Sequence, residues 1–104
     1  MRENRLRTMW KAGTPVVNGW LAILGSLQRA LGDLDRIVAW GRVFGMVNSA
    51  PGFNQQPTVI NGFSNLIVDI FGAEVGAHAR SAVGMAELPF DIPVEIEGEV
   101  VIRA

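Results

Sequence analysis

The chain has 104 residues, of which 49% are hydrophobic and 18% are charged, as is typical of one small globular domain. A formal net charge of −1 argues against a general nucleic-acid binder, and the lack of cysteine excludes disulfides, thiolate metal sites and thiol nucleophiles. A single histidine cannot build a histidine metal cluster, and no apolar run approaches the roughly 20 residues of a membrane span. We therefore expect a cytoplasmic protein with no metal and no cofactor.

The front of the chain, residues 1–15, is basic. It carries four basic side chains and one acidic side chain, and its apolar residues do not alternate, so it predicts a short helix and a loop rather than a strand. Thr14 and Pro15 then have the character of an N-cap and a first helical residue. Four charges on a short helix are a weak sign of nucleic-acid contact, and we expect none.

Apolar residues at helical spacing predict a first long helix over residues 16–31, and Gly32 ends it because glycine tolerates the left-handed conformation. The next run, residues 36–47, is rich in Val, Ile, Trp and Phe and is apolar on both faces. It therefore predicts a central strand, in which strict alternation puts Val43 on one face and Trp40 on the other.

Residues 48–58 contain Asn, Pro and Gly and predict a loop. A second apolar stripe predicts a helix from about Val59 to Phe71, which Gly72 ends. Residues 79–88 then predict a second strand.

The last predicted strand, residues 94–103, alternates regularly. Valine and isoleucine share one face, while Glu95, Glu97 and Glu99 share the other. The order helix, strand, helix, strand, strand is typical of an α+β domain, with two amphipathic helices packed on one face of a small mixed β-sheet.

Three stretches carry a resemblance to a known family: LGDLDRI at 31–37, VNSAPGFNQQPTVINGFSNLIVDIFG at 47–72 and HARSAVGMAELPFDIPVEIEGEVVI at 78–102. From about residue 21 to residue 104 the chain resembles the Rid family, also called YjgF or endoribonuclease L-PSP, in the branch described as chorismate-mutase-like in fold. The resemblance implies a homotrimer with inward-facing sheets and small-molecule clefts between subunits. Many members hydrolyse reactive enamines or imines to a ketone and ammonia.

The resemblance also implies roles for three residues. Arg80 begins the strand of the RSxVxxxxLP signature and would hold the substrate carboxylate, a role that suits the planar fork of a guanidinium. Glu95, on the last strand, would orient the attacking water, and Asn61, at the opening of the second helix, would lie near the cleft. Ala82 stands where deaminases of the family often have cysteine, which weakens that assignment.

The front of the chain departs from the family, whose members begin with strands that include an SGQ-type segment. Residues 1–23 instead resemble the opening of an HpcH/HpaI-type 2-keto-acid aldolase, but the metal-binding and catalytic residues of that family have no counterpart here, so no aldolase activity is implied. We expect an atypical basic segment over 1–15 and a truncated Rid-like domain over 16–104, with the N-terminal strands of the family missing.

Three kinds of function fit these residues. The chain is an imine or enamine deaminase, a non-catalytic trimeric module that binds a small carboxylate metabolite, or an assembly remnant with an incomplete site. Arg80 either holds a carboxylate or forms a structural ion pair with Glu95 or Glu97 at a subunit interface. The three glutamates otherwise fit a solvated strand face. His78, a lone histidine beside a loop, is more typical of a surface residue than of a base.

Overall fold

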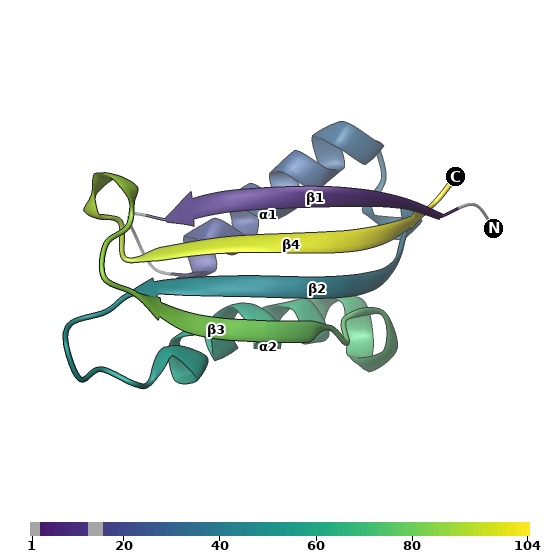
Figure 1. The fold of residues 1–104 in the computed structure, drawn as a ribbon. Coiled ribbons are helices and arrows are strands. Elements are labelled where there is room, and N and C mark those ends of the chain that lie inside the picture. Colours follow the sequence, from purple (N-terminus) through teal and green to yellow (C-terminus); the bar gives the residue numbers. More distant parts are fainter. Residues whose placement is uncertain (1–2, 13–15) are drawn as a thin grey trace.

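The computed structural model describes the backbone of residues 3–12 and 16–104, and the side chains from residue 23 onward. Its elements, in chain order, are β1 (Glu3–Ala12), α1 (Val16–Leu31), η1 (Leu34–Arg36), β2 (Ile37–Asn48), α2 (Gln56–Val75), β3 (Ala79–Met85), η2 (Pro89–Asp91) and β4 (Val94–Arg103). The two long helices lie against one sheet, which is the predicted α+β arrangement (Figure 1).

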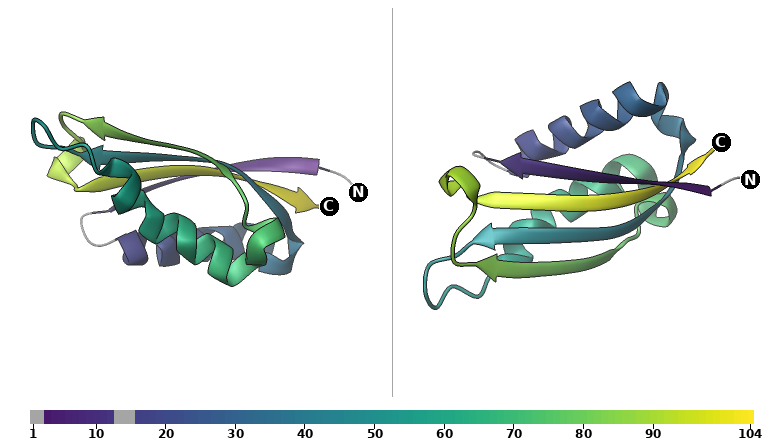
Figure 2. Two further views of the ribbon diagram at one scale, coloured as in Figure 1. Left: turned by 90° about the horizontal axis from the view of Figure 1, so that it is seen from below. Right: turned by 45° about the horizontal axis from the view of Figure 1, so that its top comes forward.

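The described strands form one mixed sheet in the order β1-β4-β2-β3. β2 pairs parallel with β3 and antiparallel with β4, and β4 also pairs antiparallel with β1. β2 is therefore an inner strand, as its two apolar faces predict. Both α1 and α2 lie on the same side of the sheet (Figure 2), so we call the other side the open face.

β1 is the main departure from the sequence analysis. It pairs with β4 along its whole length, from Glu3 opposite Arg103 to Ala12 opposite Val94. The prediction of helix and loop for 1–15 is therefore wrong over residues 3–12, and a strand occupies the sheet edge where we expected none. Pairing with a neighbouring strand outweighed the weak alternation of this segment. The predicted helix cap at residues 14–15 lies outside the described residues.

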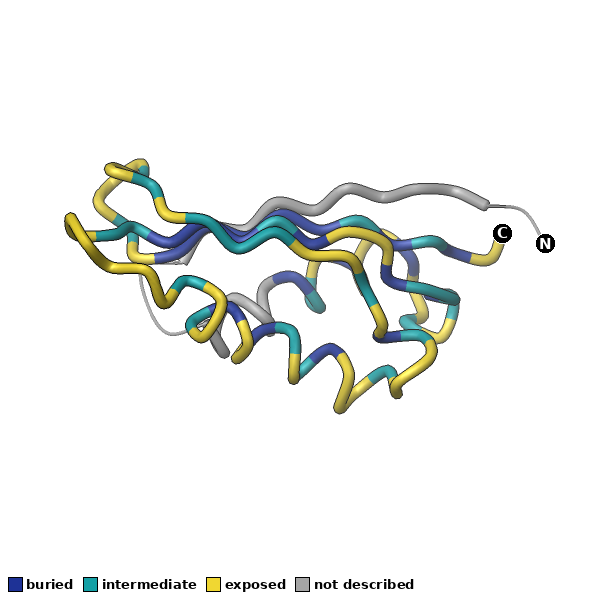
Figure 3. Tube along the Cα trace, turned by 60° about the horizontal axis from the view of Figure 1, so that its bottom comes forward, coloured by how far each residue is buried: buried dark blue, intermediate teal, exposed yellow. Residues whose placement is uncertain are grey.

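The hydrophobic core lies between the helices and the sheet (Figure 3). Its most completely buried side chains come from both helices and from the two inner strands: Ile23, Leu27, Val43, Ile60, Phe63, Ile67, Ile96 and Val100. The apolar stripes that predicted the two helices thus supply the helix side of the core. No helix in the described part of the chain has the length and hydropathy needed to cross a membrane.

Trp40 lies in the core together with Val43, so the predicted assignment of these residues to opposite faces is wrong. The register between β2 and β4 shifts between Trp40 and Val43, because a bulge in β2 changes the alternation there. The Trp40 ring packs edge-on against Phe63 and Phe71, with centroids 6.4 Å and 5.6 Å away. Composition alone carries no sign of such a bulge.

The C-terminal end of α2 is shaped by two glycines. Gly72 adopts φ 85° and breaks the helix where the sequence predicted its end, and one further turn runs to Val75. The next residue, Gly76, is buried against the helix backbone. A Cβ atom on Gly76 would lie 2.7 Å from the carbonyl oxygen of Gly72 and 2.9 Å from that of Ile67, so only glycine fits this approach.

We expect Gly76→Ala to lower the free energy of unfolding by about 1–3 kcal/mol, because the added methyl group meets fixed backbone atoms. Urea denaturation measures this loss. Gly25→Ala is the matched control: its Cβ would meet only the end of the Arg29 side chain at 3.4 Å, and alanine in a helix adds up to about 1 kcal/mol. Equal stability of the two variants would contradict the close approach of Gly76.

Candidate functional site

Arg80 and Asn61 lie in direct contact at the edge of the sheet. Arg80 is near the start of β3, and its Nη1 donates to Oδ1 of Asn61 at 2.7 Å and to Oγ of Ser64 at 3.2 Å. Asn61 and Ser64 are three residues apart on α2, so they share one helix face. Both Arg80 and Asn61 are exposed, which leaves this edge open to a ligand.

His78 extends this network. Its Nε2 lies 3.0 Å from Oγ of Ser64, and its Nδ1 lies 2.6 Å from the carbonyl oxygen of Gly76. Because a carbonyl oxygen only accepts, the network assigns a proton to Nδ1. The ring is half-buried and bonded at both nitrogens, so the expectation of a plain surface residue is wrong.

We call Asn61, Ser64, His78 and Arg80 the α2–β3 cluster. The family resemblance pointed to Arg80 and Asn61, but sequence reasoning missed Ser64 and His78. The spacing of these residues in the sequence could have revealed them. His78 precedes Arg80 by two residues, the spacing of one strand face, and Ser64 follows Asn61 by three residues, the spacing of one helix face. Both pairs are therefore placed on common faces, although the sequence does not say that these faces meet.

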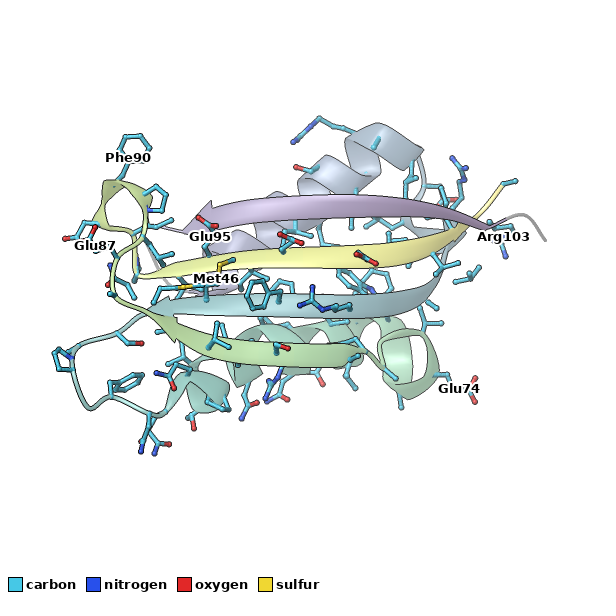
Figure 4. All side chains as sticks on the ribbon, in the orientation of Figure 1. Met46, Glu74, Glu87, Phe90, Glu95 and Arg103 are labelled. Carbon is cyan, nitrogen blue, oxygen red and sulfur yellow. The ribbon has the colours of Figure 1, made fainter. Side chains whose placement is uncertain are left out.

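Glu95 lies on the other side of the sheet from this cluster. Arg80 is opposite the core residue Val43 in the β2–β3 pairing, and its side chain reaches α2. Glu95 is opposite Met46 in the β2–β4 pairing, and both of these side chains lie on the open face (Figure 4). The strand β2 lies between β3, which carries Arg80, and β4, which carries Glu95. Within one chain, the structure therefore does not bring Arg80 and Glu95 together. The alternative ion pair of Arg80 with Glu95 or Glu97 is likewise not formed within the chain.

The glutamates of β4 share one face, as alternation predicts, but that face is not solvated at its centre. Glu95 is only 9% exposed and Glu97 only 7% exposed. Burial of a carboxylate requires partners, and both residues make polar or electrostatic contacts within the chain. The reading of these residues as a solvated strand face is therefore wrong for Glu95 and Glu97.

A hollow of about 250 Å³ spans the sheet and is lined by Gly41, Arg42, Ala79, Glu99, Val100 and Val101. None of the residues of the α2–β3 cluster lines it. The guanidinium of Arg42, which lines the hollow, lies 5.1 Å above the centre of the Phe44 ring, and this contact stabilises the cation without a ligand. We favour the α2–β3 cluster as the candidate site because its polar groups converge in one connected network. No group of three or more metal-ligating side chains occurs among the described residues.

Comparison with known proteins gives the class of fold. No family model matches the chain. It is 49% identical over 80 residues to Protein TCP17 of Trypanosoma cruzi, over 77% of this chain and 50% of that protein. The structure of Atu1372 from Agrobacterium tumefaciens is 46% identical with a TM-score of 0.77, over 82% of this chain and 54% of that one. A candidate endoribonuclease from Shewanella oneidensis is 20% identical with a TM-score of 0.80, over 96% and 80%.

These likenesses establish the YjgF-like α+β fold that the sequence predicted. The chain therefore has the fold of the Rid proteins, and it spans about half the length of Protein TCP17 and of Atu1372. The resemblance of residues 1–23 to an aldolase receives no support from any of these proteins. Residues 3–12 instead form a strand of the YjgF-like sheet.

Proposed function

We propose that this chain is a Rid-like small-molecule protein that holds a carboxylate on Arg80. The observation that carries the proposal is the set of hydrogen-bond partners of the Arg80 guanidinium. Arg80 donates through Nη1 to two neutral acceptors, and no described carboxylate is paired with it. A charged fork that is fixed at one nitrogen and open at the others suits an incoming carboxylate, which accepts two parallel hydrogen bonds.

The reaction we propose is hydrolysis of an imine or enamine of a 2-oxo acid, which releases the 2-oxo acid and ammonia. The fold and the signature residue Arg80 support it, and Ala82 at the usual cysteine position weighs against it. The sequence analysis also left open an incomplete site that lacks the N-terminal strands of the family. The pairing of β1 with β4 at the sheet edge weighs against that alternative. The alternative remains a trimeric module that binds a carboxylate without turnover.

Ammonia release from enzymatically generated 2-aminoacrylate, compared with buffer alone, tests the proposed reaction. Calorimetric titration with pyruvate, a small 2-oxo acid, tests binding separately. We expect pyruvate to bind and ammonia release to exceed the buffer rate. Binding without release would assign the alternative module, and the absence of both would contradict the proposal that Arg80 holds a carboxylate.

We also propose a homotrimer, supported by the uneven covering of the sheet. The helices cover one face, and on the open face apolar side chains of β2 and β3 stay partly exposed: Phe44, Val83 and Met85. An apolar face of this kind favours burial against another chain. We expect sedimentation at micromolar concentration to give three times the chain mass of 11.3 kDa. A clean monomer would contradict the proposal.

A further inference from the structure

We infer that Ser64 and His78 move the proton in the reaction at Arg80, with Ser64 as the relay and His78 as the base. The inference rests on the proposed function, because Arg80 is the residue that would hold the substrate. It adds two residues to which neither the fold nor the family signature assigns a role.

Among the described side chains near Arg80, few can accept a proton. Asn61 cannot, because an amide is not a base near neutral pH. Glu95 lies across the sheet on the open face, away from Arg80. Ser64 is different: its Oγ lies 3.2 Å from Nη1 of Arg80 and 3.0 Å from Nε2 of His78. The Ser64 hydroxyl therefore connects a substrate bound at Arg80 to the imidazole of His78.

The hydrogen bonds of His78 determine its tautomer. The carbonyl oxygen of Gly76 accepts from Nδ1 at 2.6 Å, so the neutral ring keeps its lone pair on Nε2, directed at Ser64. Gly76 is itself packed against the backbone of α2 at a distance that only glycine permits, which fixes the position of this carbonyl. A base oriented by a third group and bonded to a hydroxyl is the arrangement that proton-transfer sites use.

Protons and electron pairs balance along the relay from water to His78. Water attacks the imine carbon and gives a proton to Oγ of Ser64, while Ser64 passes its own proton to Nε2 of His78. The C=N electron pair moves to nitrogen, which takes that proton back along the same relay and forms the carbinolamine. The carbinolamine hydroxyl then loses its proton through the relay to the nitrogen, the C–N bond breaks, and ammonia and the 2-oxo acid leave with Ser64 and His78 in their starting states.

The test separates turnover from binding. We expect Ser64→Ala and His78→Ala to lower kcat for 2-aminoacrylate hydrolysis by roughly 100-fold or more, the range of general acid–base catalysis. Pyruvate affinity should change by less than about threefold, because Arg80 and Asn61 remain. Added imidazole should restore turnover to His78→Ala, which a purely structural role would not allow. Ser81→Ala is the matched control, since Ser81 follows Arg80 but alternates to the open face.

The outcomes distinguish this inference from the proposed function. Wild-type turnover with unchanged kcat in Ser64→Ala and His78→Ala would overturn the relay and leave the deaminase standing. Loss of kcat in Glu95→Gln with both relay variants active would assign the role to Glu95 of another copy. No wild-type turnover would overturn both proposals. If His78→Ala does not fold, Ser64→Ala still decides, and ¹⁵N NMR of the histidine ring should show a proton on Nδ1 and none on Nε2 of the neutral form.

Discussion

Replacing Arg80 with alanine is expected to abolish pyruvate binding, and Arg80→Lys is expected to weaken it. Hydrogen bonds to charged groups contribute about 1.5–3 kcal/mol each, so loss of a bidentate pair lowers affinity by roughly 100-fold or more. Lysine keeps the charge but loses the planar fork that matches a carboxylate. Calorimetric titration of the wild type and both variants measures the three affinities directly.

Arg29→Ala provides the control for the loss of one positive charge. Arg29 is exposed on α1, and it donates to Ser26 on its own helix, well away from the α2–β3 cluster. We expect its pyruvate affinity to equal that of the wild type. If Arg80→Ala binds pyruvate as the wild type does, the carboxylate clamp is wrong, and the contacts of Arg80 with Asn61 and Ser64 serve only to join β3 to α2.

Phe63→Ala is expected to lower the free energy of unfolding by about 3–5 kcal/mol, the usual cost of removing a buried aromatic side chain. Phe63 is 1% exposed and meets the Trp40 ring edge-on from the centre of α2. Small domains have a free energy of unfolding of only about 5–15 kcal/mol, so the variant should be close to unfolded at 37 °C. Urea denaturation at 25 °C gives the difference.

Asn65→Ala is the control for this change, because Asn65 lies two residues further along α2 and is exposed. Surface substitutions of this kind usually alter stability by about 0.5 kcal/mol or less. A loss below about 1 kcal/mol in Phe63→Ala would contradict the burial of this face of α2 and the core that we describe between the helices and the sheet.

The periodicity of apolar residues predicted the helices and strands whose own sequence pattern determines their structure. The predicted bounds 16–31 and 94–103 match α1 and β4, because a continuous apolar stripe and a regular alternation each need a single buried face. β1 could not be predicted in this way. Its partner, β4, lies about ninety residues away along the chain, and no local pattern reports the pairing.

The site was predictable only where a motif carried it. The signature marked Arg80, and the wider resemblance marked Asn61. The contact between these two residues follows from the packing of α2 beside β3. Alternation placed Glu95 with Glu97 on one face, but strand order was not readable from the sequence. The sequence therefore did not predict that Glu95 lies away from Arg80, nor that Ser64 contacts His78.

The pairing of β1 with β4 has a consequence for synthesis. Contacts between residues so far apart in sequence raise the contact order of the fold, and folding slows because the whole intervening chain must be ordered first. On the ribosome, Glu3–Ala12 is made before Val94–Arg103 and must wait for that strand to emerge before it finds its partner. Until then its backbone donors and acceptors are open to other nascent chains, so this strand is where aggregation during expression should begin.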